Sequence, residues 1–227
     1  MRAIAYRVIV TFCRYFVLPL YATVEVEGLE KVPRQGPLIL VANHLNDGDP
    51  GIFCVVLPRP IAFMAKAELF GYPVMKQFMD VFGFPVRRDE ADLSALRRAQ
   101  EILREGRVVG LFPEGRRSGA AARLMEARPG AALIALRTGA PVLPVAITGS
   151  QRLGMPGVFF HPLRRDRVHV RIGDPFFLLK PDRLNSEAAA RGTETIMARI
   201  AALLPPENRG YYGQMDGSEE GTGTPVG

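Results

Sequence analysis

The sequence has few cysteines and no long uncharged apolar run. Its two cysteines, Cys13 and Cys54, lie among apolar residues, as expected of small buried side chains in a reducing compartment rather than of a disulfide. Neither has the neighbours of a zinc site. The apolar stretch at residues 3–22 contains Arg7 and Arg14, so we do not expect it to form a membrane-spanning helix.

Lysine is also scarce, and arginine supplies most of the positive charge. The 227 residues include only four lysines, yet the net charge is +6 and the pI is about 9.7. Such a chain suits phosphates, anionic lipid surfaces or nucleic acid. Nucleic acid is the weakest of these partners, because the arginines are scattered and no motif of aromatic and basic residues appears.

Short apolar strands alternate with helical segments, which predicts a single-domain α/β fold with a mostly parallel central sheet flanked by helices. Strands are expected at residues 23–27, 37–42, 61–65, 84–88, 108–112, 142–147 (interrupted by Pro144) and 168–172. Helices are expected at residues 50–57, 69–82, 89–106, 131–138 and 187–204. The expected organisation is a membrane-associating amphipathic helix at residues 1–22, a domain at 23–205 and a disordered tail at 206–227.

The N-terminal helix is expected to lie on a membrane surface. Arg7 and Arg14 are seven positions apart and therefore share one helical face. Their side chains could reach lipid phosphates while the apolar residues enter the acyl region. No cleavage site for a secretory signal is present. The alternative is a helix that packs on the protein's own core.

The most informative stretch is the polar segment from Asn43 to Pro50, which lies between two apolar runs. His44 and Asp49 are five positions apart, roughly 140° around a helix, so they cannot share a helical face. The intervening Asn46–Gly48 favours a turn that can bring the carboxylate to the imidazole. A carboxylate on one ring nitrogen leaves the other free to act as a base. Alternatively, Asp49 only caps the following helix and His44 is a polar loop residue.

Three polar clusters each follow a predicted strand: His44 with Asp49, Arg88, and residues 114–118. Ligands bind beyond the carboxyl ends of parallel strands, so we expect these clusters to meet at one edge of the sheet. The arginines suit a phosphate monoester. No nucleophile elbow, Walker loop or dinucleotide fingerprint is present. A base without a protein nucleophile indicates that a hydroxyl of the substrate attacks. Taken singly, the arginines could be surface charges and Glu114 part of a simple turn.

Four motifs, in order, resemble those of the glycerolipid acyltransferases, the lysophosphatidate acyltransferase family. They are Asn43-His44 with Asp49 (N-H-x4-D), Phe84–Arg88, Phe112–Ser118 (F-P-E-G-x-R-S) and Val142–Ala146. The resemblance covers roughly residues 24–175. Two positions depart from the family pattern: Phe82 stands where the second motif often has glycine, and Arg128 stands where a lysine is frequent. These departures bear on the identity of the acceptor and not on the chemistry.

The resemblance implies transfer of a fatty acyl group from acyl-CoA, or acyl carrier protein, to the free hydroxyl of lysophosphatidate, giving phosphatidate. His44 would be the base and Asp49 would orient it. No metal or prosthetic cofactor is implied. The residues implied in substrate binding are Asn43, Arg88, Glu114, Gly115, Arg117 and Ser118.

The same resemblance implies a peripheral or monotopic protein at the cytoplasmic face of the cell membrane, with an anionic membrane surface as partner. The acyl chains would lie in an apolar groove or in the bilayer, near residues 69–82 and the N-terminal segment. One alternative is the same chemistry on a glycolipid, an amino-acid lipid or another lysophospholipid. Another is a lipid- or phosphate-binding protein, against which His44 and Asp49 argue because binding alone needs no base.

Overall fold

The computed structural model describes residues 2–87, 92–153 and 165–213, and the strands within these ranges form one seven-stranded sheet. Its order is β1-β7-β6-β2-β5-β3-β4, and all neighbours are parallel except β6 and β7. The strands are β1 (Ala22–Glu27), β2 (Leu38–Ala42), β3 (Ile61–Lys66), β4 (Gly83–Val86), β5 (Val108–Leu111), β6 (Val142–Thr148) and β7 (Asp166–Ile172). The predicted α/β fold is confirmed.

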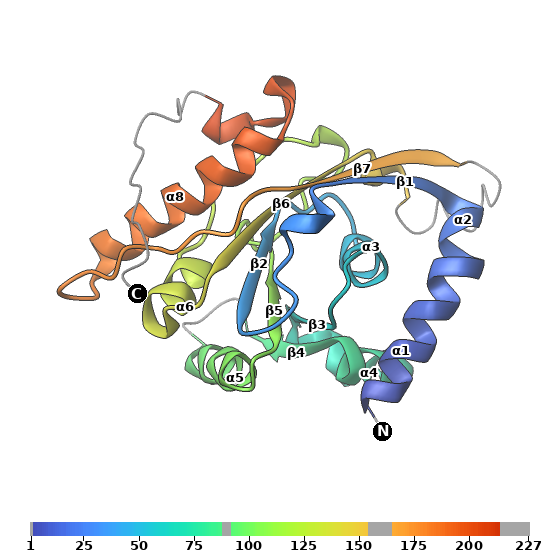
Figure 1. Ribbon diagram of the computed structural model, residues 1–227, viewed down its shortest axis with the longest axis horizontal. Coiled ribbons are helices and arrows are strands. Elements are labelled where there is room, and N and C mark those ends of the chain that lie inside the picture. The colour runs from blue at the N-terminus through green and yellow to red at the C-terminus, as the bar shows by residue number, and fades with distance from the viewer. Residues whose placement is uncertain (1, 88–91, 154–164, 214–227) are drawn as a thin grey trace.

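Helices cover both faces of the sheet (Figure 1). They are α1 (Arg2–Phe12), α2 (Leu18–Tyr21), α3 (Asp49–Val56), α4 (Pro73–Phe82), α5 (Leu93–Arg104), α6 (Gly130–Thr138) and α8 (Ser186–Leu203). One apolar cluster lies towards α5, α6 and α8, and the other lies towards α1 and α3. Ile39 and Val41 belong to the first cluster, and Leu38 and Leu40 to the second. Burial on both faces explains why the sequence of β2 is apolar throughout.

Strand β6 runs without interruption through Pro144, where the sequence predicted a break. Proline removes a backbone donor, which matters only where a neighbouring strand would accept the bond. The pairing of β6 with β7 begins one residue later, at Val145 opposite Ile172. Gly173 instead donates its N–H to the Pro144 carbonyl across 2.9 Å. The proline therefore stands just outside the ladder between β6 and β7, although it lies opposite Val41 in the ladder between β6 and β2.

The N-terminal segment is helical from α1, through a π-helical stretch at Cys13–Val17, to α2. By length and composition alone, Ile4–Tyr21 could cross a membrane, which the interrupting arginines had led us not to expect. One side packs inward: the Tyr6 hydroxyl accepts from the Ile61 N–H at 3.2 Å. The Nε of Arg14 donates to the Val55 carbonyl at 2.9 Å. The other side exposes large apolar residues, namely Ile4, Val8, Phe12, Tyr15, Phe16 and Leu20.

The folded domain continues beyond residue 205, into part of the predicted disordered tail. Pro206–Asn208 and Gly210–Tyr212 form two short 3-10 turns. The Tyr212 side chain is buried, and its hydroxyl accepts from the Ala127 N–H at 3.0 Å. This contact anchors the segment on the loop that follows the third motif. The remainder of the predicted tail, residues 214–227, lies outside the described part of the chain.

Candidate active site

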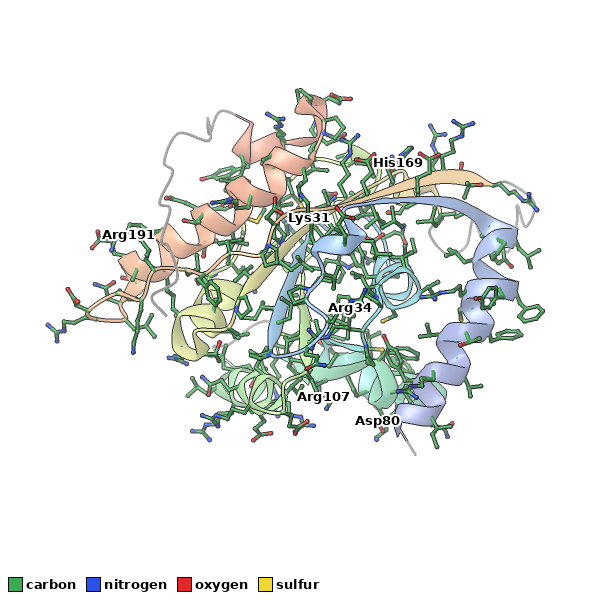
Figure 2. All side chains as sticks on the ribbon, viewed as in Figure 1. Lys31, Arg34, Asp80, Arg107, His169 and Arg191 are labelled. Atoms are coloured by element: carbon green, nitrogen blue, oxygen red, sulfur yellow. The ribbon has the colours of Figure 1, made fainter. Side chains whose placement is uncertain are left out.

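Buried polar side chains gather at one end of the sheet. Charged residues such as Arg107 and Arg191 point outward from the fold (Figure 2). The buried polar or charged residues of the described chain are Asn43, His44, Asn46, Asp49, Glu114, Ser150 and Thr193. All but Thr193 follow the carboxyl ends of β2, β5 and β6, which are adjacent in the sheet. Parallel strands thus bring the predicted clusters of His44 and Glu114 together.

The carboxylate of Asp49 turns back onto the segment that precedes α3. Its Oδ2 lies 2.9 Å from Nδ1 of His44 and accepts the backbone N–H of Leu45 at 2.6 Å and that of Asn46 at 2.9 Å. Gly48 occupies the N-cap position, and no side chain caps α3. The interpretation of Asp49 as a helix cap is therefore wrong. The turn predicted from the sequence forms instead, and it joins the carboxylate to the imidazole.

The His44 ring is held on two sides. Its Nδ1 edge faces Asp49, which is 0% exposed, and its plane stacks on Phe112 with centroids 4.0 Å apart and an interplanar angle of 17°. Phe112 in turn stacks on Phe63 at 5.4 Å. With Nδ1 engaged, Nε2 on the opposite ring edge is the nitrogen that can exchange a proton with a ligand. This arrangement suits a general base of fixed orientation.

Glu114 supports the segment that carries His44. Its Oε1 accepts the His44 N–H at 3.0 Å, and its Oε2 accepts the Met125 N–H at 2.9 Å. The side chain is 2% exposed, and this burial raises the pKa of the carboxyl to about 7, against the lowering effect of the two hydrogen bonds. The two oxygens of this buried carboxyl already accept backbone N–H groups of the protein itself. The structure thus gives Glu114 a supporting role for the backbone, and its expected contact with the acceptor stays a prediction.

Three further motif residues also make internal contacts. The Asn43 amide bonds both the carbonyl and the N–H of Ile147, each across 2.8 Å, and so fastens the end of β2 to β6. Ser118 donates its backbone N–H to the His44 carbonyl at 2.8 Å. Gly115 has a φ of +66°, a conformation that favours glycine, and closes a turn by donating to the Phe112 carbonyl at 3.0 Å. These residues shape the site.

The arginines are placed differently. Arg117 is exposed and forms an ion pair with Asp47, in the loop between His44 and Asp49. It therefore stands beside the catalytic candidates with its guanidinium at the surface. Arg88 lies outside the described residues, so its predicted place in the site is not tested. Within the described ranges, no group of three or more His, Cys, Asp or Glu side chains could hold a metal ion.

Two residues of the site did not emerge from the sequence as site residues. Ser150 donates its hydroxyl to Oδ1 of Asp49 at 2.6 Å and is 0% exposed. It follows β6 by two residues, so the rule that located the other clusters could have found it. Phe112 was part of a recognised motif, but nothing in the sequence indicated that its ring stacks on His44.

The chain belongs to the acyltransferase family, whose model, described as Acyltransferase, matches residues 23–148. It is 30% identical over 190 residues to the 1-acyl-sn-glycerol-3-phosphate acyltransferase of Bacillus subtilis (strain 168), with coverage of 82% of this chain and 91% of that protein. It is 31% identical over 188 residues to the chloroplastic 1-acyl-sn-glycerol-3-phosphate acyltransferase BAT2 of Brassica napus, covering 79% of this chain and 52% of that protein.

Two further comparisons agree with this assignment. A 1-acyl-sn-glycerol-3-phosphate acyltransferase of Borreliella burgdorferi is 31% identical over 149 residues, 64% of this chain and 59% of that protein. This chain thus spans between half and three fifths of the Brassica and Borreliella proteins. The crystal structure of the 1-acyl-sn-glycerophosphate (LPA) acyltransferase PlsC from Thermotoga maritima superposes with a TM-score of 0.68, at 27% identity, over 89% of this chain and 79% of that one.

Proposed function

We propose that this acyltransferase moves a fatty acyl group from acyl-CoA, or acyl carrier protein, to the free hydroxyl of lysophosphatidate, giving phosphatidate. The observation that carries the proposal is the buried His44–Asp49 pair, in which Asp49 holds one ring nitrogen at 2.9 Å and no described residue forms a hydrogen bond with the other. The curated relatives, named for this acceptor, support the choice of lysophosphatidate.

In this mechanism, Nε2 of His44 accepts the proton of the acceptor hydroxyl as its oxygen attacks the thioester carbonyl. The carboxylate of Asp49 stabilises the imidazolium that forms. Collapse of the tetrahedral intermediate breaks the carbon–sulfur bond, and the His44 proton passes to the leaving thiolate. No covalent acyl-enzyme is required, because the attacking oxygen belongs to the acceptor.

Arg117 is the residue we assign to the acceptor's phosphate. A guanidinium can bind phosphate through paired charge-assisted hydrogen bonds. Its present partner, Asp47, is itself exposed, so the ion pair is at the surface and a dianionic phosphate can compete with it. Arg88 is proposed as a second phosphate ligand on the basis of its motif alone.

The N-terminal helix and its surroundings are proposed to meet the membrane and the acyl chains. The exposed apolar residues of the helix form a surface that could enter the lipid interface. A groove of about 420 Å³ lies between this helix, β1 and the end of α3; its walls include the apolar residues Leu18, Val24 and Val55 together with Arg14 and Arg165. Because α3 begins at Asp49 and is about 12 Å long, the groove is within reach of a fatty acyl chain attached at the site.

The proposal is tested by assaying the purified protein with radiolabelled acyl-CoA, or acyl carrier protein, and a panel of acceptors. Lysophosphatidate, glycerol 3-phosphate, a neutral monoacylglycerol and lysophosphatidylcholine separate the roles of the phosphate and the first acyl chain. We expect lysophosphatidate to give the highest kcat/KM and His44→Ala to remove the activity. Preference for a lyso-lipid without a phosphate monoester would instead support another acceptor, and binding without turnover would support a lipid-binding protein.

A further inference from the structure

The carboxylate of Asp49 has a partner on each oxygen. Oδ2 faces His44 and two backbone N–H groups, whereas Oδ1 lies 2.6 Å from the hydroxyl oxygen of Ser150. In this second contact the Ser150 hydroxyl donates and the carboxylate oxygen accepts. The bond is short, as expected when the acceptor is ionised.

Ser150 is itself firmly placed by its backbone. It follows Gly149, whose φ is +84° and at which a Cβ would lie 2.0 Å from the carbonyl oxygen of Arg167 in β7. The close approach of β6 and β7 therefore fixes the turn that leads into Ser150. The carbonyl of Ser150 accepts from the side-chain amide of Asn46 and from the N–H of Leu153. Two hydrogen bonds, one from Asn46 and one from Leu153, thus hold the backbone of the serine in position.

We propose that Ser150 is a positioning residue for the His44–Asp49 pair, which fixes the plane of the carboxylate through Oδ1 while Oδ2 holds the imidazole. This inference rests on the catalytic roles proposed above for His44 and Asp49. Loss of the hydroxyl would leave a buried anionic oxygen without the donor that the structure gives it. The carboxylate could then rotate, and Nε2 of His44 would lose its alignment with the acceptor hydroxyl.

The test compares Ser150→Ala with Thr193→Val, a control that also removes a buried hydroxyl. The Thr193 hydroxyl bonds the Ala189 carbonyl in α8, away from the strand ends that form the site. We expect Ser150→Ala to lower kcat roughly 10- to 100-fold, as for the loss of a hydrogen bond to a charged group, with both KM values within about twofold. The control should leave kcat within about twofold. A wild-type kcat in folded Ser150→Ala, or a rise in acceptor KM without loss of kcat, would overturn the inference.

A double-mutant cycle separates positioning from a general structural effect. Ser150→Ala is introduced into wild type and into Asp49→Asn, and single-turnover rates are measured for all four proteins. If Ser150 acts through the carboxylate, its substitution should change the rate of Asp49→Asn by less than about threefold, because the carboxylate that it positions is already absent. Equal effects in the two backgrounds would show that Ser150 acts independently of Asp49 and would overturn the proposal.

Two further proteins keep the test decisive. If Ser150→Ala does not fold, Ser150→Cys takes its place, because the thiol has a similar shape and is only a weak donor. Reduced kcat at unchanged KM supports the inference, and a wild-type kcat overturns it. His44→Ala, assayed in parallel, shows which idea has failed. An active His44→Ala would contradict the proposed mechanism, whereas an inactive one beside a fully active Ser150→Ala would contradict this inference alone.

Discussion

The backbone N–H of His44 donates to Oε1 of Glu114 across 3.0 Å and thereby joins the segment after β2 to the segment after β5. The second carboxylate oxygen accepts from Met125 at 2.9 Å. A single buried side chain thus connects the candidate base to the loop beyond the third motif. Because burial raises the pKa of this carboxyl to about 7, its charge changes in the neutral range.

The first prediction is that Glu114→Gln changes how stability depends on pH. The pKa of Glu114 is raised from 4.5 to about 7 in the folded protein, so folding favours the protonated form. Its stabilising contribution is fully present below pH 4.5 and is lost as the pH rises through 7. Between pH 5 and 8, the free energy of unfolding of wild type should therefore fall roughly 2 to 3 kcal/mol more than that of Glu114→Gln.

Urea unfolding of both proteins at these two pH values measures the difference. The glutamine cannot ionise, and any fixed cost of a lost hydrogen bond to Met125 is the same at both pH values. The other titrating groups are shared by the two proteins and cancel in the comparison. Parallel pH dependences would mean that the carboxyl titrates alike in the folded and unfolded states.

Much of the fold was accessible from the sequence because parallel strands are buried on both faces. Residues 38–42 show this plainly, since their uninterrupted apolar run marks a central strand. Pro144 misled the prediction, because the effect of a missing N–H depends on where the neighbouring strand ends. The packing of Tyr212 could not be predicted from its own neighbours in the sequence either, because Tyr212 bonds a loop that lies far away in the sequence.

The sequence predicted some contacts of the candidate site and not others. The His44–Asp49 contact followed from a local turn, which sequence can indicate. The contacts of Asn43, Glu114 and Ser118 could not be predicted, because residue type does not say whether a polar group faces a ligand or the protein's own backbone. Whether such a group faces a ligand or the backbone depends on how deeply it is buried. Its burial in turn depends on how the ends of the strands come together in the folded protein. Ser150 shows that residues following the carboxyl end of a strand can belong to the site even when they lie outside the recognised motifs.

The second prediction concerns the dyad. His44→Ala should fold normally and lose about 10²- to 10⁴-fold in kcat, the usual effect of removing a general base. Asp49→Asn should also lose most activity, because an amide can present a donor to Nδ1 and favour the wrong tautomer. Its NH₂ group would also replace an oxygen that now accepts hydrogen bonds, either Oδ2 with two backbone N–H groups or Oδ1 with the Ser150 hydroxyl. Steady-state kinetics on proteins with matched circular dichroism spectra measure both effects. A folded His44→Ala enzyme with more than about a tenth of wild-type turnover would contradict the mechanism.

The third prediction separates acceptor binding from donor binding at Arg117. Arg117→Ala should raise the KM for lysophosphatidate roughly 10- to 150-fold, the equivalent of one charge-assisted hydrogen bond, and leave the KM for acyl-CoA nearly unchanged. Arg98→Ala is the control, since it removes another exposed, ion-paired arginine on α5. Initial rates with each substrate varied in turn give both constants. If the KM for acyl-CoA rises instead, Arg117 binds phosphates of the donor.

The fourth prediction tests whether the exposed apolar side of the N-terminal helix meets the membrane. Val8, Phe12 and Phe16 are each more than half exposed and follow one another at intervals of four. In an α-helix, residues four apart drift by about 40° around the axis. The wider π-helical turn at Cys13–Val17 reduces this drift and keeps the apolar residues on one side. Phe12 and Phe16 stack there, with ring centroids 5.3 Å apart.

Deleting the whole helix would remove the inward contacts of Tyr6 and Arg14, so substitution of outward residues is the cleaner experiment. Phe12→Glu with Phe16→Glu should lower partitioning onto anionic vesicles by about 100-fold or more, since each buried Phe contributes roughly 1.5–3 kcal/mol. Phe177→Glu with Leu179→Glu is the matched control, because both residues are exposed. They belong to the segment between β7 and α8, which runs away from α1 towards the opposite side of the molecule (Figure 1). Vesicle co-sedimentation compares the three proteins.

Salt should weaken the binding of wild type only partly, because the apolar contact is not screened. Equal pelleting of both double variants would show that another surface binds the membrane.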